Sequence, residues 1–277
     1  MGRKIEFAFY FIAILFFIIR YADTDTDDRR VRVPKSQPPA VFLPENARLP
    51  QDEGTVQVEL DRSLHSGVGT AFAVDSNGTY VTARHVVDGC SEVFFVRSRG
   101  GLEQVASYVS ENNRDFAVIK AIDAGDFHLA LSGRVLSRGN DGFMMGFPQG
   151  NPADVRATVI GRTEMRSSGR YRMREPVIAW VERERKPGFG GSLGGISGGP
   201  VFDADGSVVG TVVAGAPRRG RVYTTHPRIF GETGLLSPST QGRTPRLADG
   251  ITEGNYHTVG KTLRASGAIK QVYCRVN

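Results

Sequence analysis

The sequence predicts a mostly β domain whose short strands form a barrel or a sandwich. Apolar residues recur at every second position in short runs that Gly, Asn, Asp or Ser bound, which is typical of strands. The predicted strands, spaced by roughly 10 to 15 residues, are 55–60, 69–74, 79–82, 92–96, 115–120, 176–181 and 207–213. Asn77-Gly78 between two of them is a strong hairpin signal. Helical spacing of Tyr256, Val259 and Leu263 predicts one late helix from about Gly254 to Ala265.

Composition supports a folded chain with a substantial core. The 277 residues include 40% apolar residues, two cysteines, 35 Lys+Arg and 29 Asp+Glu, for a formal charge of +6. These values exclude disordered, collagen-like and disulfide-stapled chains, and they fit one or two domains. So mild a charge does not suggest a dedicated nucleic-acid binder, and we expect no nucleic acid as a partner.

The first 21 residues have the order of an export signal. Arg3 and Lys4 precede an apolar run from Phe7 to Ile19, and small residues that would favour cleavage are missing at Arg20-Tyr21. Thirteen helical residues span about 20 Å, which is short of the roughly 30 Å hydrocarbon core. We favour an uncleaved N-terminal signal anchor over residues 1–21 that leaves the rest of the chain exported, in the periplasm or at the cell exterior. Cleavage, which would give a secreted protein, and a buried core helix are the alternatives.

Residues 22–54 form the next segment. Four aspartates and three arginines lead into five prolines, with few large apolar side chains between them. Such a composition cannot bury enough apolar surface to fold, and it predicts a disordered, proline-rich linker. The folded domain is therefore expected over residues 55–277. Cys90 and Cys274 fit an exported protein either as one disulfide or as two buried thiols, and neither lies in a metal-binding spacing.

Three motifs carry candidate chemistry. His85 follows the strand that ends at Thr82, and Asp115 opens an apolar strand. Ser197 stands at the apex of the glycine-rich segment Gly190–Pro200, where main-chain N–H groups can turn toward one point. Singly, the histidine could be a core residue, the aspartate a turn residue and the glycines a flexible loop or a phosphate cradle. Together they supply a nucleophile, a base and a group that orients the base, as acyl transfer requires.

These segments resemble the trypsin-like serine peptidases, and their spacing of 30 and 82 residues is closest to the HtrA/DegP-type branch. The segments Gly142–Gly150 and Thr262–Lys270 resemble that branch as well. The resemblance implies a chymotrypsin-like fold of two six-stranded antiparallel β-barrels with a C-terminal helix. The chain ends soon after that helix, so we expect no PDZ domain.

The resemblance also assigns roles. Ser197 would attack the peptide carbonyl, His85 would move its proton, and Asp115 would hold the imidazole. The N–H groups of Gly195 and Ser197 would form the oxyanion hole, without metal or cofactor.

Two positions depart from the family pattern. Ile196 replaces a polar residue of the oxyanion loop, so packing or substrate has to order that loop. Arg84 stands beside His85 in the sequence, and strand alternation predicts that it faces away.

Substrate selection is expected around Ser192 and around Thr211, Val212 and Val213, none of which is charged. A small or aliphatic residue before the cleaved bond is therefore favoured over Arg, Lys or Glu. We predict an exported, membrane-tethered serine endopeptidase that acts on proteins or peptides. The alternative is an inactive or weakly active pseudo-peptidase that binds extended peptides or a partner protein. The natural substrate and the oligomeric state stay open.

Overall fold

The computed structural model describes residues 54–60, 64–97, 100–123, 127–216, 220–236 and 250–277. All of them belong to one compact unit, Phe42–Asn277. The predicted anchor over 1–21 and nearly all of the predicted linker over 22–54 lie outside the described residues. Within the described ranges, each helix is too short or too polar to cross a lipid bilayer.

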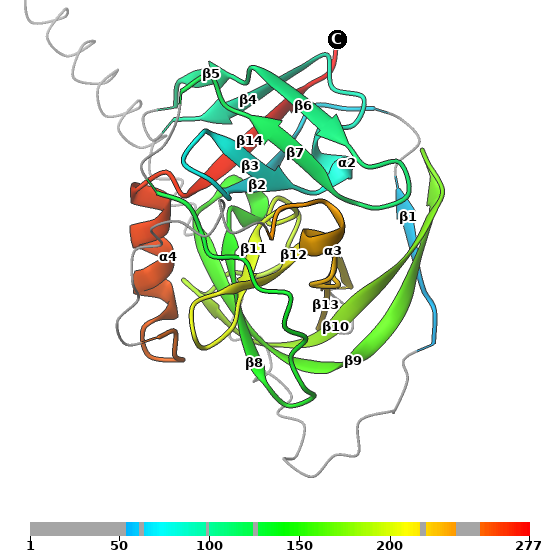
Figure 1. Ribbon diagram of the computed structural model, residues 1–277, viewed down its shortest axis with the longest axis vertical. Helices are drawn as coiled ribbons and strands as arrows, with labels where there is room; N and C mark the ends of the chain where they lie inside the picture. Colours follow the sequence, from blue (N-terminus) through cyan, green and yellow to red (C-terminus); the bar gives the residue numbers. More distant parts are fainter. Residues whose placement is uncertain (1–53, 61–63, 98–99, 124–126, 217–219, 237–249) are drawn as a thin grey trace, which may run out of the picture. The chain divides into compact units, whose positions relative to one another are not determined.

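The described residues form two antiparallel sheets (Figure 1). The N-terminal sheet has the order β5-β4-β14-β2-β3-β7-β6. Its strands are β2 (Gly67–Ala73), β3 (Thr79–Thr82), β4 (Glu92–Val96), β5 (Leu102–Gln104), β6 (Ser107–Ser110), β7 (Ala117–Lys120) and β14 (Ile269–Arg275). The predicted hairpin is confirmed: β2 pairs with β3, and Gly78 adopts a φ of 78° in the turn.

The C-terminal sheet has the order β1-β9-β10-β13-β12-β11-β8, and pairing of β8 with β9 closes it into a barrel. Its strands are β1 (Val56–Leu60), β8 (Asp141–Gly146), β9 (Ala153–Gly169), β10 (Met173–Lys186), β11 (Pro200–Phe202), β12 (Val208–Ala216) and β13 (Arg221–Thr225). β1 lies outside the closed ring and pairs with β9 in parallel.

Each sheet therefore counts seven strands among the described residues, where six were expected. In the C-terminal sheet the seventh strand is β1, added to the closed ring. In the N-terminal sheet β5 and β6 are the two halves of one bent strand. Val105 N–H donates to Val93 O, and the next residue, Ala106, donates to Lys120 O across the barrel. At the bend, the partner strand thus changes from β4 to β7 between two neighbouring residues, and one strand is divided into two.

The predicted late helix is confirmed as α4 (Tyr256–Ala265), with Tyr256, Val259 and Leu263 buried. Asp154, which is fully buried on β9, anchors it by accepting hydrogen bonds from His257 Nδ1 and from both Nη atoms of Arg264. The sequence analysis did not predict the strand β14 that follows. After α4 the chain turns at Gly267 and pairs between β2 and β4, so the C-terminal segment completes the N-terminal sheet. In the described part of the chain, the remaining helices are single turns: α2 (Arg84–Val87), η1 (Pro148–Gly150) and α3 (Ile229–Glu232).

Candidate active site

Strand pairing brings His85 and Asp115 together. Thr82 of β3 pairs with Ala117 of β7, so the residues just beyond these strand ends lie at the same edge of the sheet. His85 lies on α2, directly after β3. Its Nδ1 lies 2.6 Å from Asp115 Oδ2, and its main-chain N–H donates to Asp115 Oδ1 at 2.9 Å. Asp115 is 1% exposed, so the carboxylate is held by protein groups rather than by water.

This contact sets the electrostatics of the imidazole. Burial alone would lower the pKa of His85, but the charge and the hydrogen bond of Asp115 outweigh it, and the pKa is raised above its ordinary value. Because Nδ1 faces Asp115, the other ring nitrogen, Nε2, is left to accept a proton. The pair therefore has the polarity that a general base needs.

The glycine-rich segment holds Ser197 at the boundary between the two sheets. Thr70 of β2 binds this segment twice: its hydroxyl donates to Gly195 O at 2.8 Å, and its N–H donates to Ser197 O at 2.8 Å. Gly198 has a φ of 85°, and a Cβ there would lie 2.1 Å from Thr70 O. Only glycine allows the loop to approach β2 this closely.

From Gly195 to Gly199, two N–H groups are unpaired within the described residues. The N–H groups of Ile196, Gly198 and Gly199 donate to main-chain carbonyls, whereas those of Gly195 and Ser197 donate to none. Gly194 O accepts the N–H of Gln149 at 2.5 Å. Since C=O and N–H point in opposite directions across a trans peptide, the N–H of Gly195 points away from Gln149. Both unpaired donors belong to residues that line one cavity.

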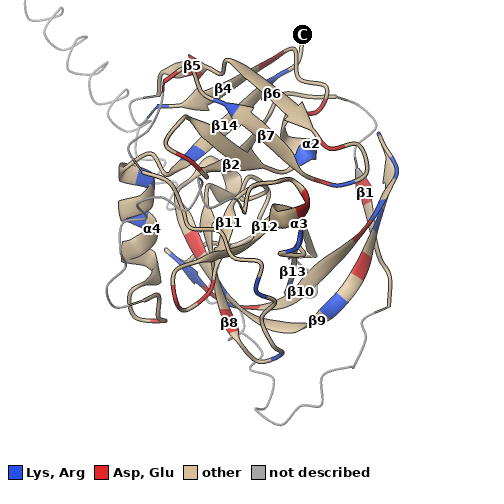
Figure 2. Ribbon diagram, viewed as in Figure 1, with Lys and Arg blue, Asp and Glu red and all other residues tan. Residues whose placement is uncertain are grey.

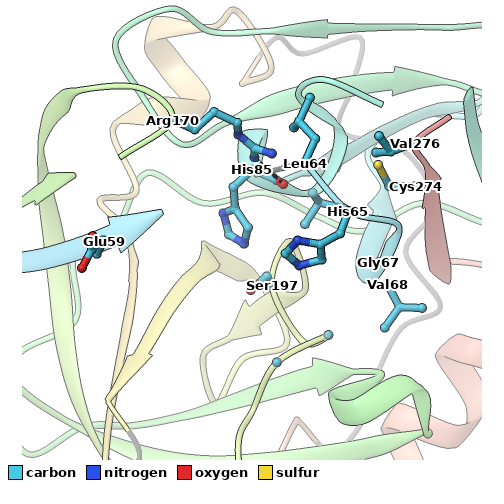
Figure 3. A pocket seen from close by; sticks show the side chains of 13 residues that line it. Glu59, Leu64, His65, Gly67, Val68, His85, Arg170, Ser197, Cys274 and Val276 are labelled. Carbon is cyan, nitrogen blue, oxygen red and sulfur yellow. Dashed lines mark hydrogen bonds between the residues drawn. The ribbon is translucent and has the colours of Figure 1, made fainter. Parts of the chain in front are cut away.

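That cavity, of about 350 Å³, is shared by His85 and Ser197 (Figure 3). No hydrogen bond joins Ser197 Oγ to His85 Nε2 among the described residues. The cavity is also lined by side chains that the sequence analysis did not single out, among them Glu59, Leu64, His65 and Arg170. Figure 3 shows the rings of His65 and His85 close to Ser197. His65 follows β1 in a segment without any motif, so no local signal could have found it.

Ile196 is 1% exposed and packs in an apolar cluster with Leu193 and Val212. Its Cγ1 also lies against Gly146, where an added Cβ would be 3.0 Å away. The expectation that packing orders this loop therefore agrees with the position of Ile196. An apolar side chain here replaces the polar contacts that the family pattern would supply.

A second, smaller cavity of about 110 Å³ adjoins Ser197. Of the four residues expected to select substrate, Ser192 and Val212 line it, together with Ile196, Ala214 and Gly215. Thr211 and Val213 do not line it. Val212 and Ala214 of β12 line the cavity, whereas Thr211 is fully buried and Val213 packs in an apolar cluster with residues of both sheets.

Arg84 faces away from the imidazole, as expected, although it begins a helix and not a strand. Its Nη1 donates to the carbonyls of Glu111 and Asn112 at 3.1 and 2.7 Å. The pairing of the cysteines, left open by the sequence, is a disulfide that joins Cys90, just after α2, to Cys274 of β14. This crosslink ties the segment that carries His85 to the C-terminal strand. Within the described ranges no three His, Cys, Asp or Glu side chains cluster as a metal site would require.

Residues 69–210, half of the chain, match the family described as trypsin-like peptidase domain. The chain belongs to this family. A curated relative, the "probable periplasmic serine endoprotease DegP-like" of Marinomonas sp. (strain MWYL1), is 30% identical over 157 residues, which cover 56% of this chain and 31% of that protein. The trypsin-like domain thus spans about a third of the length of the relative it matches.

Two solved structures of the Rv3671c protease of M. tuberculosis, both in an inactive form, share the fold. They superpose with a TM-score of 0.50 at 18% and 17% identity, cover 64% and 62% of this trypsin-like chain, and are themselves covered to 88%. At this level of identity the similarity shows a chymotrypsin-like fold and nothing about substrates.

Proposed function

We propose that the protein is an exported serine endopeptidase that hydrolyses peptide bonds through an acyl-enzyme. The observation that carries the proposal is the 2.6 Å contact between His85 and Asp115 at a cavity that Ser197 also lines, with two unpaired N–H donors beside it. Family membership supports the same reaction class.

The mechanism follows from these positions. Ser197 Oγ attacks the substrate carbonyl while His85 Nε2 takes its proton, and Asp115 stabilises the imidazolium that forms. The carbonyl oxygen becomes negative and accepts hydrogen bonds from the N–H groups of Gly195 and Ser197, worth about 3 to 4 kcal/mol of barrier for one donor. His85 then protonates the leaving amine. Water, activated by the same imidazole, releases the acyl group from Ser197.

The small cavity beside Ser197 fits the side chain that precedes the cleaved bond. Its volume of about 110 Å³ is below the roughly 150 Å³ of an engineered apolar cavity that holds benzene. Val212, Ala214 and Ile196 offer no charge. A small or aliphatic side chain is therefore the proposed substrate preference.

Export is the second part of the proposal. The Cys90–Cys274 disulfide fits an oxidising compartment, and the curated relative is named as periplasmic. The charged-then-apolar order of residues 1–21 predicts the segment that directs or tethers the chain. The folded domain would then act on the exported side of the membrane.

The alternative is a domain that binds extended peptides without cleaving them. It is favoured by one observation, the absence of a hydrogen bond between Ser197 and His85 in the described residues. Catalytic hydrogen bonds are often long before substrate binds, so a missing Ser197–His85 hydrogen bond is compatible with activity. Incubating the full chain with unfolded casein separates the two functions. We expect fragments whose formation Ser197→Ala abolishes, whereas saturable binding of intact casein without fragments would support the alternative.

A further inference from the structure

The β9–β10 hairpin is much longer than the other strand pairs. Its strands have 17 and 14 residues, and register pairs Ser167 with Met173 at the far end. Figure 2 shows acidic and basic residues along β9, where Glu164 forms ion pairs with Arg166 and with Arg174 of β10. At its end the hairpin contacts α2: Arg170 Nη2 donates to His85 O at 3.1 Å. An element of the C-terminal sheet therefore reaches the histidine that the N-terminal sheet carries.

Two side chains of this hairpin contact Asp115 directly. Tyr171 donates its hydroxyl to Asp115 Oδ1 at 3.3 Å, and Glu175 Oε1 accepts the main-chain N–H of Asp115 at 3.0 Å. Glu175 is 2% exposed. Met173, Glu175 and Val177 occupy alternate, inward-facing positions of β10, so an acidic side chain stands where an apolar one would be expected.

Tyr171 is itself held in place. The guanidinium carbon of Arg84 lies 4.0 Å from the centre of the Tyr171 ring, and that of Arg170 lies 5.7 Å from it. Both arginines also lie within 3.7 Å of Asp88, the residue that follows α2. The phenol is therefore fixed with its hydroxyl against Asp115 before any substrate arrives.

A buried, ionised Glu175 beside Asp115 is energetically unfavourable. Burial raises the pKa of Glu175 to about 7, and the negative charge of Asp115 adds to the effect. A neutral amide could accept the same hydrogen bond from Asp115 N–H without this repulsion. Glu175 thus acts on the His85–Asp115 pair in two ways, through the hydrogen bond that it accepts from Asp115 and through its negative charge.

We propose that Tyr171 and Glu175 are positioning residues that hold Asp115 and adjust the basicity of His85 in opposite directions, a role that rests on the proposed function of the pair. The hydroxyl of Tyr171 withdraws charge from the carboxylate and so weakens its hold on a protonated imidazole. The carboxylate of Glu175 adds negative charge near the imidazole and strengthens it. The basicity of His85 is then set by the balance between the Tyr171 hydroxyl and the Glu175 carboxylate.

The charged and titratable groups around His85 come from every neighbouring element. α2 and the residue after it contribute Arg84 and Asp88, the segment before β7 contributes Arg114 and Asp115, the hairpin contributes Arg170, Tyr171 and Glu175, and β1 with its continuation contributes Glu59 and His65. Among the described residues of the other sheet, the side chains that hydrogen-bond to Asp115 itself are Tyr171 and Glu175.

The test is the titration of His85, followed by histidine NMR in the full chain carrying Ser197→Ala. We expect Tyr171→Phe to raise the His85 pKa and Glu175→Gln to lower it, each by roughly half a pH unit or more. Tyr80→Phe, which removes a buried hydroxyl that donates to Gly267 O at 3.0 Å, and Arg172→Gln at the exposed tip of the hairpin are the matched controls. Both controls should leave the titration unchanged.

The same variants with Ser197 intact give an independent readout. The acid limb of kcat/KM should move with the His85 pKa, upward for Tyr171→Phe and downward for Glu175→Gln. Glu175→Ala, which removes the acceptor, should lower kcat roughly tenfold more than Glu175→Gln with little change in KM. Shifts of the same sign in both variants, or shifts no larger than those of the controls, overturn the proposal. Because NMR needs no turnover, an inactive chain would contradict the proposed function while leaving this result readable.

Discussion

Thr70 of the N-terminal sheet donates its hydroxyl to the carbonyl of Gly195, 2.8 Å away in the loop that carries Ser197. The same hydroxyl accepts the N–H of Phe147 at 3.1 Å, and Thr70 is fully buried. One side chain thus fixes two segments of the C-terminal half against β2. The shape of the proposed oxyanion hole depends on this bridge between the sheets.

Thr70→Val should therefore impair catalysis more than its small change in shape suggests. Valine leaves Phe147 N–H and Gly195 O buried without their partner, at about 1–3 kcal/mol. We expect kcat/KM to fall about 10- to 100-fold, measured on a peptide substrate. Thr262→Val removes a hydroxyl that donates to Thr258 O on the exposed face of α4, and it should have almost no effect. Equal activities of the two variants would contradict the bridging role.

Ile196→Asn should destabilise the Ser197 loop, although the family pattern favours a polar residue there. Ile196 is 1% exposed among apolar side chains, so the amide would be buried without a partner. We expect a loss of about 2–4 kcal/mol in the free energy of unfolding, measured with urea, together with reduced turnover. Ile196→Val should cost about 1 kcal/mol. An Asn variant as stable as the Val variant would show that the loop is ordered in another way.

Gly215→Val should narrow the preference for the residue before the cleaved bond. An added Cβ at Gly215 meets nothing closer than 3.9 Å, so the change should not disturb folding, but its methyl groups would enter the cavity of about 110 Å³. In a peptide library we expect Val and larger aliphatic side chains to lose reactivity relative to Ala by about tenfold. An unchanged profile would place the specificity pocket elsewhere.

Glu175 should give the protein a pH-dependent stability. Its pKa of about 7 in the folded state lies above the ordinary value, so the native state keeps a proton that the unfolded chain has already released. Stability contributed by this group is therefore lost as the pH rises from about 4.5 to about 7. Glu175→Gln lacks this dependence.

The free energy of unfolding of Glu175→Gln, relative to that of the parent chain, should thus rise by on the order of 2 kcal/mol between about pH 5 and about pH 8, because only the parent chain loses stability. Urea unfolding at both values measures it. Glu164→Gln on the neighbouring strand β9 is the control, because hydrogen bonds from Arg174 and Arg166 lower the pKa of Glu164, so that it is ionised in the folded and unfolded states throughout this range. A constant difference for Glu175→Gln would mean that the carboxyl is ionised throughout this range.

Sequence reasoning located several strands and the late helix, because short runs of β-branched and aromatic residues bounded by turn residues mark strands, and burial on one face gives the helix its period. It missed β14, since Ile269–Arg275 has partners that come from β2 and β4, far away in sequence. It expected Thr211 and Val213 to select substrate along with Val212, but they do not line the small cavity beside Ser197, because the sequence does not show which residues of β12 face that cavity.

The candidate site shows the same division. His85, Asp115 and Ser197 were singled out as candidates because each stands in a motif that resembles the family pattern. Tyr171 and Glu175 carry no motif; only the long β9–β10 hairpin brings them to Asp115. The available sequence signal for Glu175 was its position: it lies at an inward-facing position of β10 between the apolar residues Met173 and Val177.

The nucleophilic character of Ser197 is the claim on which the rest depends, and covalent labelling tests it most directly. Treating the full chain with a fluorophosphonate, followed by intact-mass analysis and peptide mapping, should give one adduct per chain, located on Ser197. The adduct should be absent from Ser197→Ala and strongly slowed in His85→Ala, whose fold can be checked by circular dichroism. A folded parent chain that remains unlabelled, or that is labelled at another residue, would contradict the account.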